Sequence, residues 1–347
     1  MKIAIFDTHR YDRDAFERAN VSVGYDLVFL EPRLIRQTAP LGVGFDVICS
    51  FVNDRVDRDV LQTLRDGGVR LLALRSAGYN HVDLAAAAAL GLPVVRVPEY
   101  SPHAVAEHAV GLVLALNRKI HRAHARVREG NFSLEGLVGF DLRGKTVGLC
   151  GTGRIGSIAA RIFTGFGCRV IAHDLRPSET LMRDLGVSYV TLPELYRESD
   201  ILSLHTPLTP ETHHQIDAAA FAQMKPGVVL VNTGRGAVID SRALIDALKQ
   251  GRLGGAALDV YEEEEGIFFR DLSDLVLQDD VLARLLTFPN VLITAHQGFL
   301  THEALDHIAA TTLENVRAFE GGALRNQVHA AEMIQPSARD GSASRSQ

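Results

Sequence analysis

Short apolar runs alternate with amphipathic segments along the first hundred residues. The runs KIAIF, YDLVFL, FDVICSF and LLALRSAG are typical of strands, whereas DRDAFERAN and residues 60–66 have helical spacing. The segment VDLAAAAALG predicts a short helix that ends at Gly91, and residues 92–97 predict another strand. This alternation indicates βαβ units on a parallel sheet.

A second series of the same kind begins after residue 144. Six strand-like segments, each followed by a helix or turn signal, predict a doubly wound dinucleotide-binding domain: KTVGLC, CRVIAHD, DILSLHTP, VVLVNTG, GGAALDV and NVLITAH. Between the two series, residues 101–128 keep helical spacing and predict one long helix, and residues 131–144 predict a glycine-rich loop.

The helical pattern THEALDHIAATTLENVRAFEGG near the end of the chain predicts a return to the first domain. A length of 347 residues fits two domains. We therefore expect an α/β protein in which a Rossmann domain, residues 101–298, is inserted into a second doubly wound, flavodoxin-like domain, residues 1–100 and 299–335. Residues 336–347 are expected to form a flexible tail.

Composition and charge exclude several classes of protein. A net charge of -6 without a run of Lys or Arg argues against nucleic acid or an anionic membrane as a partner. The apolar run before Asp7 is too short for a signal peptide or a membrane span. Three cysteines, Cys49, Cys150 and Cys168, lie in apolar stretches and predict buried thiols and a cytoplasmic location.

The segment GTGRIG predicts a cofactor site. It places Gly151, Gly153 and Gly156 between an apolar strand and a helix, the spacing that lets a backbone approach a pyrophosphate. The next strand ends in Asp174, where a carboxylate accepts hydrogen bonds from the adenosine ribose and repels a 2'-phosphate. The pattern predicts NAD, although Arg176 leaves use of NADPH open.

Three residues that follow strand-like segments predict the chemistry: Arg235 in VNTGRGAVID, Glu264 in LDVYEEEEG and His296 in ITAHQGF. Reduction of a keto acid needs an anchor for the carboxylate and an acid for the carbonyl oxygen. Arginine is a planar, bidentate anchor, histidine exchanges protons near neutral pH, and a carboxylate orients the imidazole.

Each of these residues also has a purely structural explanation. A histidine after a strand is often structural, Glu264 lies in a run of four glutamates that suits a solvated turn, and Arg235 between two glycines suits a loop surface. The sequence spacing alone leaves both explanations open.

At these residues the chain resembles the D-2-hydroxyacid dehydrogenase family, and within it the fermentative NAD-dependent D-lactate dehydrogenases. The matching stretches follow one another from about residue 72 to 319 and include RSAGYNHVDL, VPEYSPHAVAEHAVGL, SDILSLHTPLTPET, VVLVNTGRGAVIDS, LDVYEEEEGIFF and AHQGFLTHEAL. The HQGFL segment favours the lactate branch, whereas Gly234 departs from the small polar residue usual there.

The resemblance implies roles for individual residues. Arg235 would bind the substrate carboxylate, Glu264 would pair with the histidine, and His296 would be the proton donor. Further substrate contacts would come from the Ala77 and Gly78 backbone, Tyr100 and Phe299. Besides the three glycines and Asp174, the implied cofactor contacts are Arg154, Ile155, His205, Thr206, Pro207, Thr212, Thr233, Gly234, Arg235, Asp259 and His296.

The sequence thus predicts an NAD-dependent D-2-hydroxyacid dehydrogenase, with reversible reduction of pyruvate to D-lactate as the leading reaction and residues 1–100 and 299–335 as the substrate domain. Two alternatives stay open: a larger 2-keto acid as substrate, or an NADH-sensing binding protein that keeps this fold. No His, Cys and Asp cluster has metal-ligand spacing, so no metal is expected. The family pairs through its dinucleotide domains, which implies a homodimer or homotetramer, with residues 101–128 as a contact surface.

Overall fold

A computed structural model describes residues 1–264 and 266–329. These residues form two units. Unit 1 consists of Met1–Tyr100 and the segment from Thr301 onward, and unit 2 is Ser101–Leu300. The predicted boundaries fall after residues 100 and 298. The predicted tail at 336–347 and the last residues of the predicted substrate domain, 330–335, lie outside the described residues.

Unit 1 contains a five-stranded parallel sheet with the strand order β2-β1-β3-β4-β5. This order is the flavodoxin-like form of the doubly wound fold, as the sequence predicts. Its elements are β1 (Lys2–Ile5), α1 (Arg10–Asn20), β2 (Asp26–Phe29), η1 (Ala39–Gly42), β3 (Val47–Ser50), α2 (Arg58–Asp66), β4 (Leu71–Leu74), α3 (Leu84–Ala89), β5 (Val94–Arg96) and α12 (His302–Glu320).

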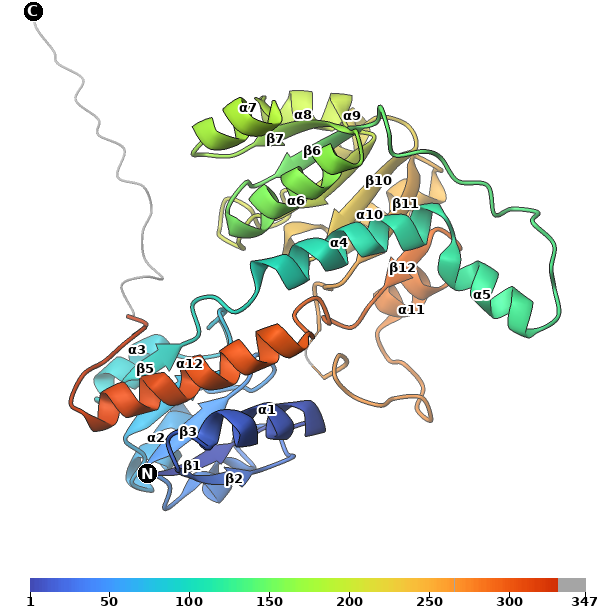
Figure 1. Ribbon diagram of the computed structural model, residues 1–347. Helices are drawn as coiled ribbons and strands as arrows, with labels where there is room; N and C mark the ends of the chain where they lie inside the picture. Colours follow the sequence, from blue (N-terminus) through green and yellow to red (C-terminus); the bar gives the residue numbers. More distant parts are fainter. Residues whose placement is uncertain (265, 330–347) are drawn as a thin grey trace, which may run out of the picture. The chain divides into compact units, whose positions relative to one another are not determined.

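The central strands of this sheet are buried on both faces. Every residue of β3 and β4 is buried, as expected for parallel strands with helices on either side. Helix α12, which comes from the far end of the sequence, lies along α1 and also contacts β4 and β5 (Figure 1). Both ends of the chain therefore build one core.

Unit 2 contains a seven-stranded parallel sheet with the order β12-β11-β10-β9-β6-β7-β8. Strands β7 and β8 follow on one side of β6, and strands β9 to β12 follow on its other side. The point between β6 and β9 where the strand order switches is a feature of dinucleotide-binding folds. Its strands are β6 (Thr146–Cys150), β7 (Arg169–His173), β8 (Ser188–Tyr189), β9 (Ile201–Leu204), β10 (Val228–Asn232), β11 (Leu253–Leu258) and β12 (Val291–Ile293). Six of them confirm the predicted segments, and the two-residue strand β8 was not predicted.

Helices cover both faces of this sheet. They are α4 (Pro102–Asn117), α5 (Ile120–Arg128), α6 (Arg154–Gly165), α7 (Glu179–Leu185), α8 (Leu192–Glu198), α9 (Ala218–Gln223), η2 (Gly236–Val238), α10 (Ser241–Lys249) and α11 (Asp280–Leu286). In β10, Val228 and Leu230 pack into the cluster that includes α9 and α10, whereas Val229 and Val231 face the cluster of α4 and α6. This period of two gives each face its own apolar core.

The predicted single helix over residues 101–128 is wrong. Helix α4 ends at Asn117, and Lys119, with a left-handed φ of 50°, starts the separate helix α5. No residue of α5 is buried. Together with the predicted loop that follows, α5 forms an arm, residues 118–141, that extends from the body of unit 2 (Figure 1). A kink here escapes sequence analysis because no Gly or Pro marks it.

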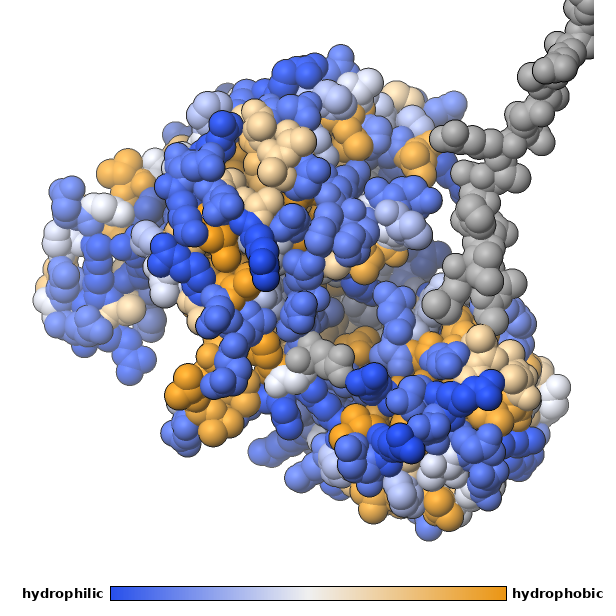
Figure 2. Space-filling view, turned by 180° about the vertical axis from the view of Figure 1, so that it is seen from behind, coloured by the Kyte–Doolittle hydropathy of each residue, from blue (hydrophilic) through white to orange (hydrophobic). Residues whose placement is uncertain are grey.

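Three further properties of the structure bear on the sequence predictions. The thiols of Cys49, Cys150 and Cys168 are free and buried, as predicted. None of the helices in the described part of the chain is both long and apolar enough to cross a membrane. Hydrophilic side chains cover most of the face shown in Figure 2, and hydrophobic groups lie in smaller areas between them.

Candidate active site

Three loops at one edge of the unit 2 sheet carry the predicted catalytic side chains. Arg235 follows β10, Glu264 follows β11 and His296 follows β12, and these three strands are neighbours in the sheet. Because all strands are parallel, their carboxyl ends and the loops after them share one edge, where doubly wound sheets bind ligands.

A hydrogen bond joins His296 and Glu264. The Nδ1 atom of His296 lies 2.7 Å from Oε2 of Glu264, and both side chains are mostly buried. Since a carboxylate accepts hydrogen bonds, Nδ1 is the donor, and Nε2 is the nitrogen left for exchange with a ligand. His296 has a left-handed φ of 55°, and its N–H donates to the carbonyl of Asp259 at 2.7 Å. The backbone and the glutamate together set the ring's orientation.

The loop after β11 holds Glu264 by its own contacts. Its other oxygen, Oε1, accepts the N–H of Tyr261 at 2.9 Å, and its carbonyl accepts the N–H groups of Ile267 and Phe268 at 3.1 Å. The Tyr261 hydroxyl donates to the Asp279 carboxylate at 3.0 Å, at the start of α11. The glutamate is thus positioned from both ends of its side chain.

Asp259 holds the segment that carries His296. Its buried carboxylate accepts the Thr294 hydroxyl at 2.6 Å and the N–H groups of Gln297 and Gly298, both at 2.8 Å. His108 of helix α4 adds a contact of 3.2 Å. Burial by itself would raise the carboxyl pKa, but the hydrogen bonds from His108, Thr294 and Gly298 hold the pKa of Asp259 below its ordinary value. The group therefore stays ionised at neutral pH.

A close backbone contact places the arginine loop beside the glutamate loop. A Cβ at Gly236 would overlap the carbonyl group of Tyr261, so only glycine permits this approach. Asn232 braces the same loop: its Nδ2 donates to the Arg235 carbonyl at 2.9 Å, and its Oδ1 accepts the Gly234 N–H at 3.0 Å. Nη1 of Arg235 donates to the Gly234 carbonyl at 2.8 Å, and the planar guanidinium carries further donors.

Phe269 borders the histidine, and Phe299 packs against Phe269. The Phe269 ring lies 5.9 Å from the His296 ring and 6.5 Å from the Phe299 ring, measured between centroids, in tilted arrangements. Phe299 is buried and Phe269 is half-buried. The imidazole therefore has an apolar flank, which suits a small apolar group of a substrate.

The predicted cofactor turn has the close contacts that its glycines imply. Gly151 has a left-handed φ of 92°, and a Cβ there would come within 2.9 Å of the His205 carbonyl. A Cβ at Gly156 would overlap the Gly151 carbonyl oxygen. Helix α6 begins at Arg154, and its N-cap, Gly153, has no side chain to occupy the N–H groups of the first turn. A phosphate has direct access to those donors.

Asp174 lies directly after β7 and beside the glycine turn. Its Oδ2 accepts the Thr152 N–H at 2.6 Å, and its Oδ1 accepts the Arg176 N–H at 2.8 Å. Burial acts to raise the pKa of Asp174, but these hydrogen bonds hold it below its ordinary value. A fixed negative charge therefore stands where the sequence analysis expects the adenosine ribose.

The loops after β9 and β10 contain the other predicted cofactor residues of this edge. Nε2 of His205 lies 2.9 Å from the Ser203 hydroxyl, and burial lowers the pKa of His205 to about 4, so the ring is neutral. Thr212 braces its loop by donating to the Pro207 carbonyl at 2.6 Å. The buried hydroxyl of Thr233 has no hydrogen-bond partner among the described residues.

Three predicted substrate residues belong to unit 1, and their contacts within that unit are as follows. The carbonyl of Ala77 accepts a hydrogen bond from Arg96 at 2.8 Å, and that of Gly78 accepts one from the Ser76 hydroxyl at 2.7 Å. Tyr100, the last residue of the first segment, is half-buried. Their predicted contacts with substrate stay predictions.

Comparison with known proteins identifies the family. Residues 110–298 match the model for the NAD-binding domain of D-isomer-specific 2-hydroxyacid dehydrogenases. The chain is 52% identical to the D-lactate dehydrogenase of Escherichia coli K12 over 322 residues, which are 93% of this chain and 98% of that protein. The chain belongs to the D-2-hydroxyacid dehydrogenase family.

Solved structures of relatives agree with this dehydrogenase fold. The apo-structure of the D-lactate dehydrogenase from Escherichia coli has a TM-score of 0.88 at 50% identity and covers 94% of this chain and 100% of its own. A pyruvate reductase of Chlamydomonas reinhardtii has a TM-score of 0.89 at 45% identity and covers 93% and 97%. The predicted family, fold class and NAD-dependent enzyme class are thus confirmed.

The residues of this dehydrogenase fit NAD. The glycine turn leaves room for a pyrophosphate at the start of α6, Asp174 offers acceptors for a ribose, and the buried Thr233 hydroxyl has no partner within residues 1–264 and 266–329. When bound, the nicotinamide supplies or accepts the hydride. Contacts of the other predicted residues with the cofactor stay predictions.

The sequence analysis gave no role to two residues that shape this site. His108 appeared within the stretch VAEHAVGL, but nothing in that stretch signals that it contacts Asp259 and Thr294. Phe269 lies in the quoted segment EEEEGIFF, where its place beside His296 is visible only after folding. Residues of different elements meet here, and local patterns do not encode such contacts.

Proposed function

We propose that this dehydrogenase reduces pyruvate to D-lactate with NADH, reversibly. The observation that carries the proposal is the hydrogen bond of 2.7 Å between His296 and Glu264, on a loop packed against the loop of Arg235. The similarity to a D-lactate dehydrogenase and to a pyruvate reductase supports the choice of substrate.

The three side chains divide the work in this proposal. The Arg235 guanidinium binds the substrate carboxylate through paired N–H donors. Protonated His296 donates from Nε2 to the carbonyl oxygen during reduction, and in oxidation the neutral ring accepts the proton. Glu264 holds the proton on Nδ1, fixes the ring's orientation and stabilises its charged form.

The apolar flank favours a small substrate side chain. Phe269 lies beside the histidine and Phe299 beside Phe269, and the methyl group of pyruvate would face these rings. One additional methylene in such a pocket changes binding by only about 1–3 kcal/mol. A larger 2-keto acid is therefore the second candidate.

Two variants test the catalytic assignments. His296→Ala should lose nearly all turnover while it still binds NADH, because the ring donates a proton and does not hold the cofactor alone. Arg235→Gln should raise KM for the keto acid and lower kcat/KM. Steady-state rates and fluorescence titration with NADH measure both effects. An active His296→Ala enzyme would refute the role of this histidine.

A panel of 2-keto acids with graded side chains, assayed with NADH and NADPH, tests the substrate. The highest kcat/KM should belong to pyruvate with NADH. A higher value for a branched or aromatic keto acid would favour the second candidate. Binding of NADH without turnover of any keto acid would instead favour a sensing protein.

Assembly and location complete the proposal. The arm exposes Ile120, Val127, Phe132, Leu134 and Val138, and hydrophobic side chains gathered on one segment support its use as a contact with a second copy. Sedimentation should therefore give a homodimer or a homotetramer. The three free, buried thiols support a cytoplasmic location.

A further inference from the structure

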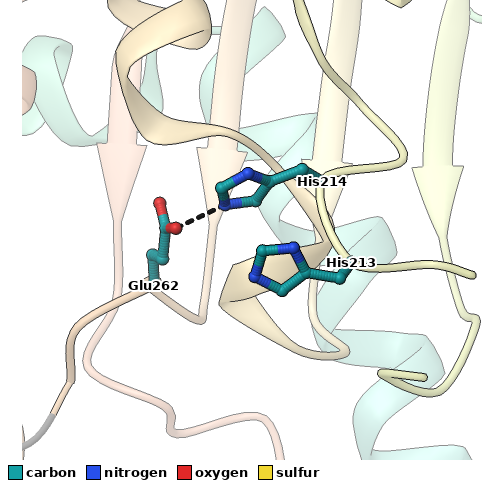
Figure 3. A group of neighbouring side chains, drawn as sticks. All are labelled: His213, His214 and Glu262. Atoms are coloured by element: carbon teal, nitrogen blue, oxygen red, sulfur yellow. Dashed lines mark hydrogen bonds and ion pairs between the residues drawn. The ribbon is translucent and has the colours of Figure 1, made fainter. Parts of the chain in front are cut away.

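A group of metal-ligating side chains lies outside the catalytic residues. His213 and His214 belong to the loop between β9 and α9, and Glu262 follows β11 (Figure 3). One ligand atom from each residue lies within 4.8 Å of the other two. Within residues 1–264 and 266–329, no other group of three such side chains converges in this way. Folding thus creates a cluster that the sequence spacing does not reveal.

The cluster has a defined geometry. Nε2 of His214 lies 2.5 Å from Oε1 of Glu262, and the two imidazole rings are stacked with centroids 4.0 Å apart. His214 has a left-handed φ of 51°, and its N–H donates to the Ala237 carbonyl at 2.8 Å. In an extended segment, adjacent side chains point to opposite sides. The backbone at His214 is left-handed and not extended, and the two rings therefore lie on one side of the loop.

The ligand types of this cluster suit a cation. Glu262 offers two carboxylate oxygens, and Oε1 is the atom that contacts His214. The Ser241 N–H is 3.3 Å from Oε2, at the start of α10. A structural ion pair needs only His214 and Glu262, whereas the His213 imidazole adds a further nitrogen ligand at the same point.

We propose that His213, His214 and Glu262 bind one divalent transition-metal ion of the zinc class. Two imidazoles and one carboxylate are a usual set of three protein ligands for Zn²⁺, with water in the fourth position. Mg²⁺ and Ca²⁺ prefer sets of oxygen ligands, so they do not fit. Ligand atoms around tetrahedral zinc lie closer together than 4.8 Å, and side-chain rotations within the cluster bring them in.

The site would tie together two loops that serve the active site. The His213–His214 loop follows the predicted cofactor residues His205 to Thr212, and Glu262 stands two residues before Glu264. A bound ion would replace one hydrogen bond between these loops with three coordinate bonds. Because the ion binds the folded protein only, it should also raise the thermal stability of the enzyme.

Calorimetric titration of the chelator-treated enzyme with Zn²⁺ tests the proposal. One ion per chain should bind, and the same titration with Mg²⁺ should give no signal. His213→Ala and Glu262→Gln should each weaken Zn²⁺ binding by at least about tenfold, since loss of even an indirect partner of a metal costs that much. His103→Ala is the matched control, because His103 and Glu107, 4.0 Å apart, form an exposed pair without a second imidazole.

A second measurement separates binding from a folding defect. Zn²⁺ should raise the Tm of the wild-type enzyme and of His103→Ala, but not that of His213→Ala. His213 is exposed and belongs to neither the predicted substrate nor cofactor residues, so its variant should keep the metal-free activity. The proposal is overturned if the wild-type enzyme binds no Zn²⁺, or if His213→Ala binds it as tightly as the wild type.

Discussion

Replacement of Glu264 by glutamine is the sharpest test of the catalytic arrangement. The change removes a negative charge 2.7 Å from Nδ1 of His296 but keeps an oxygen that can accept the Tyr261 N–H. A hydrogen bond to a charged group contributes about 1.5–3 kcal/mol. If this energy is available only when the ring is protonated, kcat/KM for reduction should fall about 10- to 150-fold. The pair is partly shielded from water, so salt should change this result little.

The assay is kcat/KM for pyruvate, measured at neutral pH with saturating NADH. The value for Glu264→Gln should fall by this factor, because the imidazole has lost its carboxylate partner. Glu263→Gln is the control, since Glu263 is the exposed neighbour in the same run of glutamates. Equal rates for Glu264→Gln and wild type would refute the reasoning. An equal loss of rate in Glu263→Gln would show that the glutamates only shape their loop.

Three further variants test other parts of the structure. Asp174→Asn removes the charge beside the predicted ribose site and should raise kcat/KM with NADPH relative to NADH by about tenfold or more; an unchanged ratio would contradict the predicted role of Asp174. Gly156→Ala should lower the free energy of unfolding by about 1–3 kcal/mol, because its Cβ overlaps Gly151, whereas Gly153→Ala, with nothing within 4 Å, should not. Asp259→Asn should destabilise the enzyme by about 2 kcal/mol at pH 7, since an amide cannot accept all of these hydrogen bonds. The folded pKa of Asp259 is depressed, so its contribution is complete above its ordinary value of 3.8 and is lost as the pH falls below it. The difference between variant and wild type should therefore shrink in urea titrations at decreasing pH.

Much of the fold could be predicted because it repeats local rules. The buried strands of unit 2 are apolar runs, and the glycine turn needs its residues at fixed positions, so both leave a signal in a short stretch of sequence. Strand β8 leaves no signal in the sequence, because two residues are too few to show the alternation of a strand. The break between α4 and α5 also left none, since a lysine with a left-handed φ forms it.

The candidate site could be predicted only in part, for a related reason. Arg235, Glu264 and His296 each follow a strand, so their common edge was predictable from the parallel sheet. The contacts of His108 with Asp259 and of Phe269 with the histidine join separate elements. Such contacts depend on how helix α4 and the loop after β11 pack, which the order of residues within either segment does not specify.

The return of helix α12 to unit 1 sets an order of events during synthesis on the ribosome. Strands β1 to β5 are translated first, but the surface of α1, β4 and β5 that α12 covers stays open to water until residues 302–320 have emerged. Unit 2 is contiguous and can complete its core before that point, since domains fold as units during translation. The segment translated first is therefore the one completed last, and a nascent chain of which only residues up to about 300 have left the ribosome would carry a finished dinucleotide domain and an unfinished sheet.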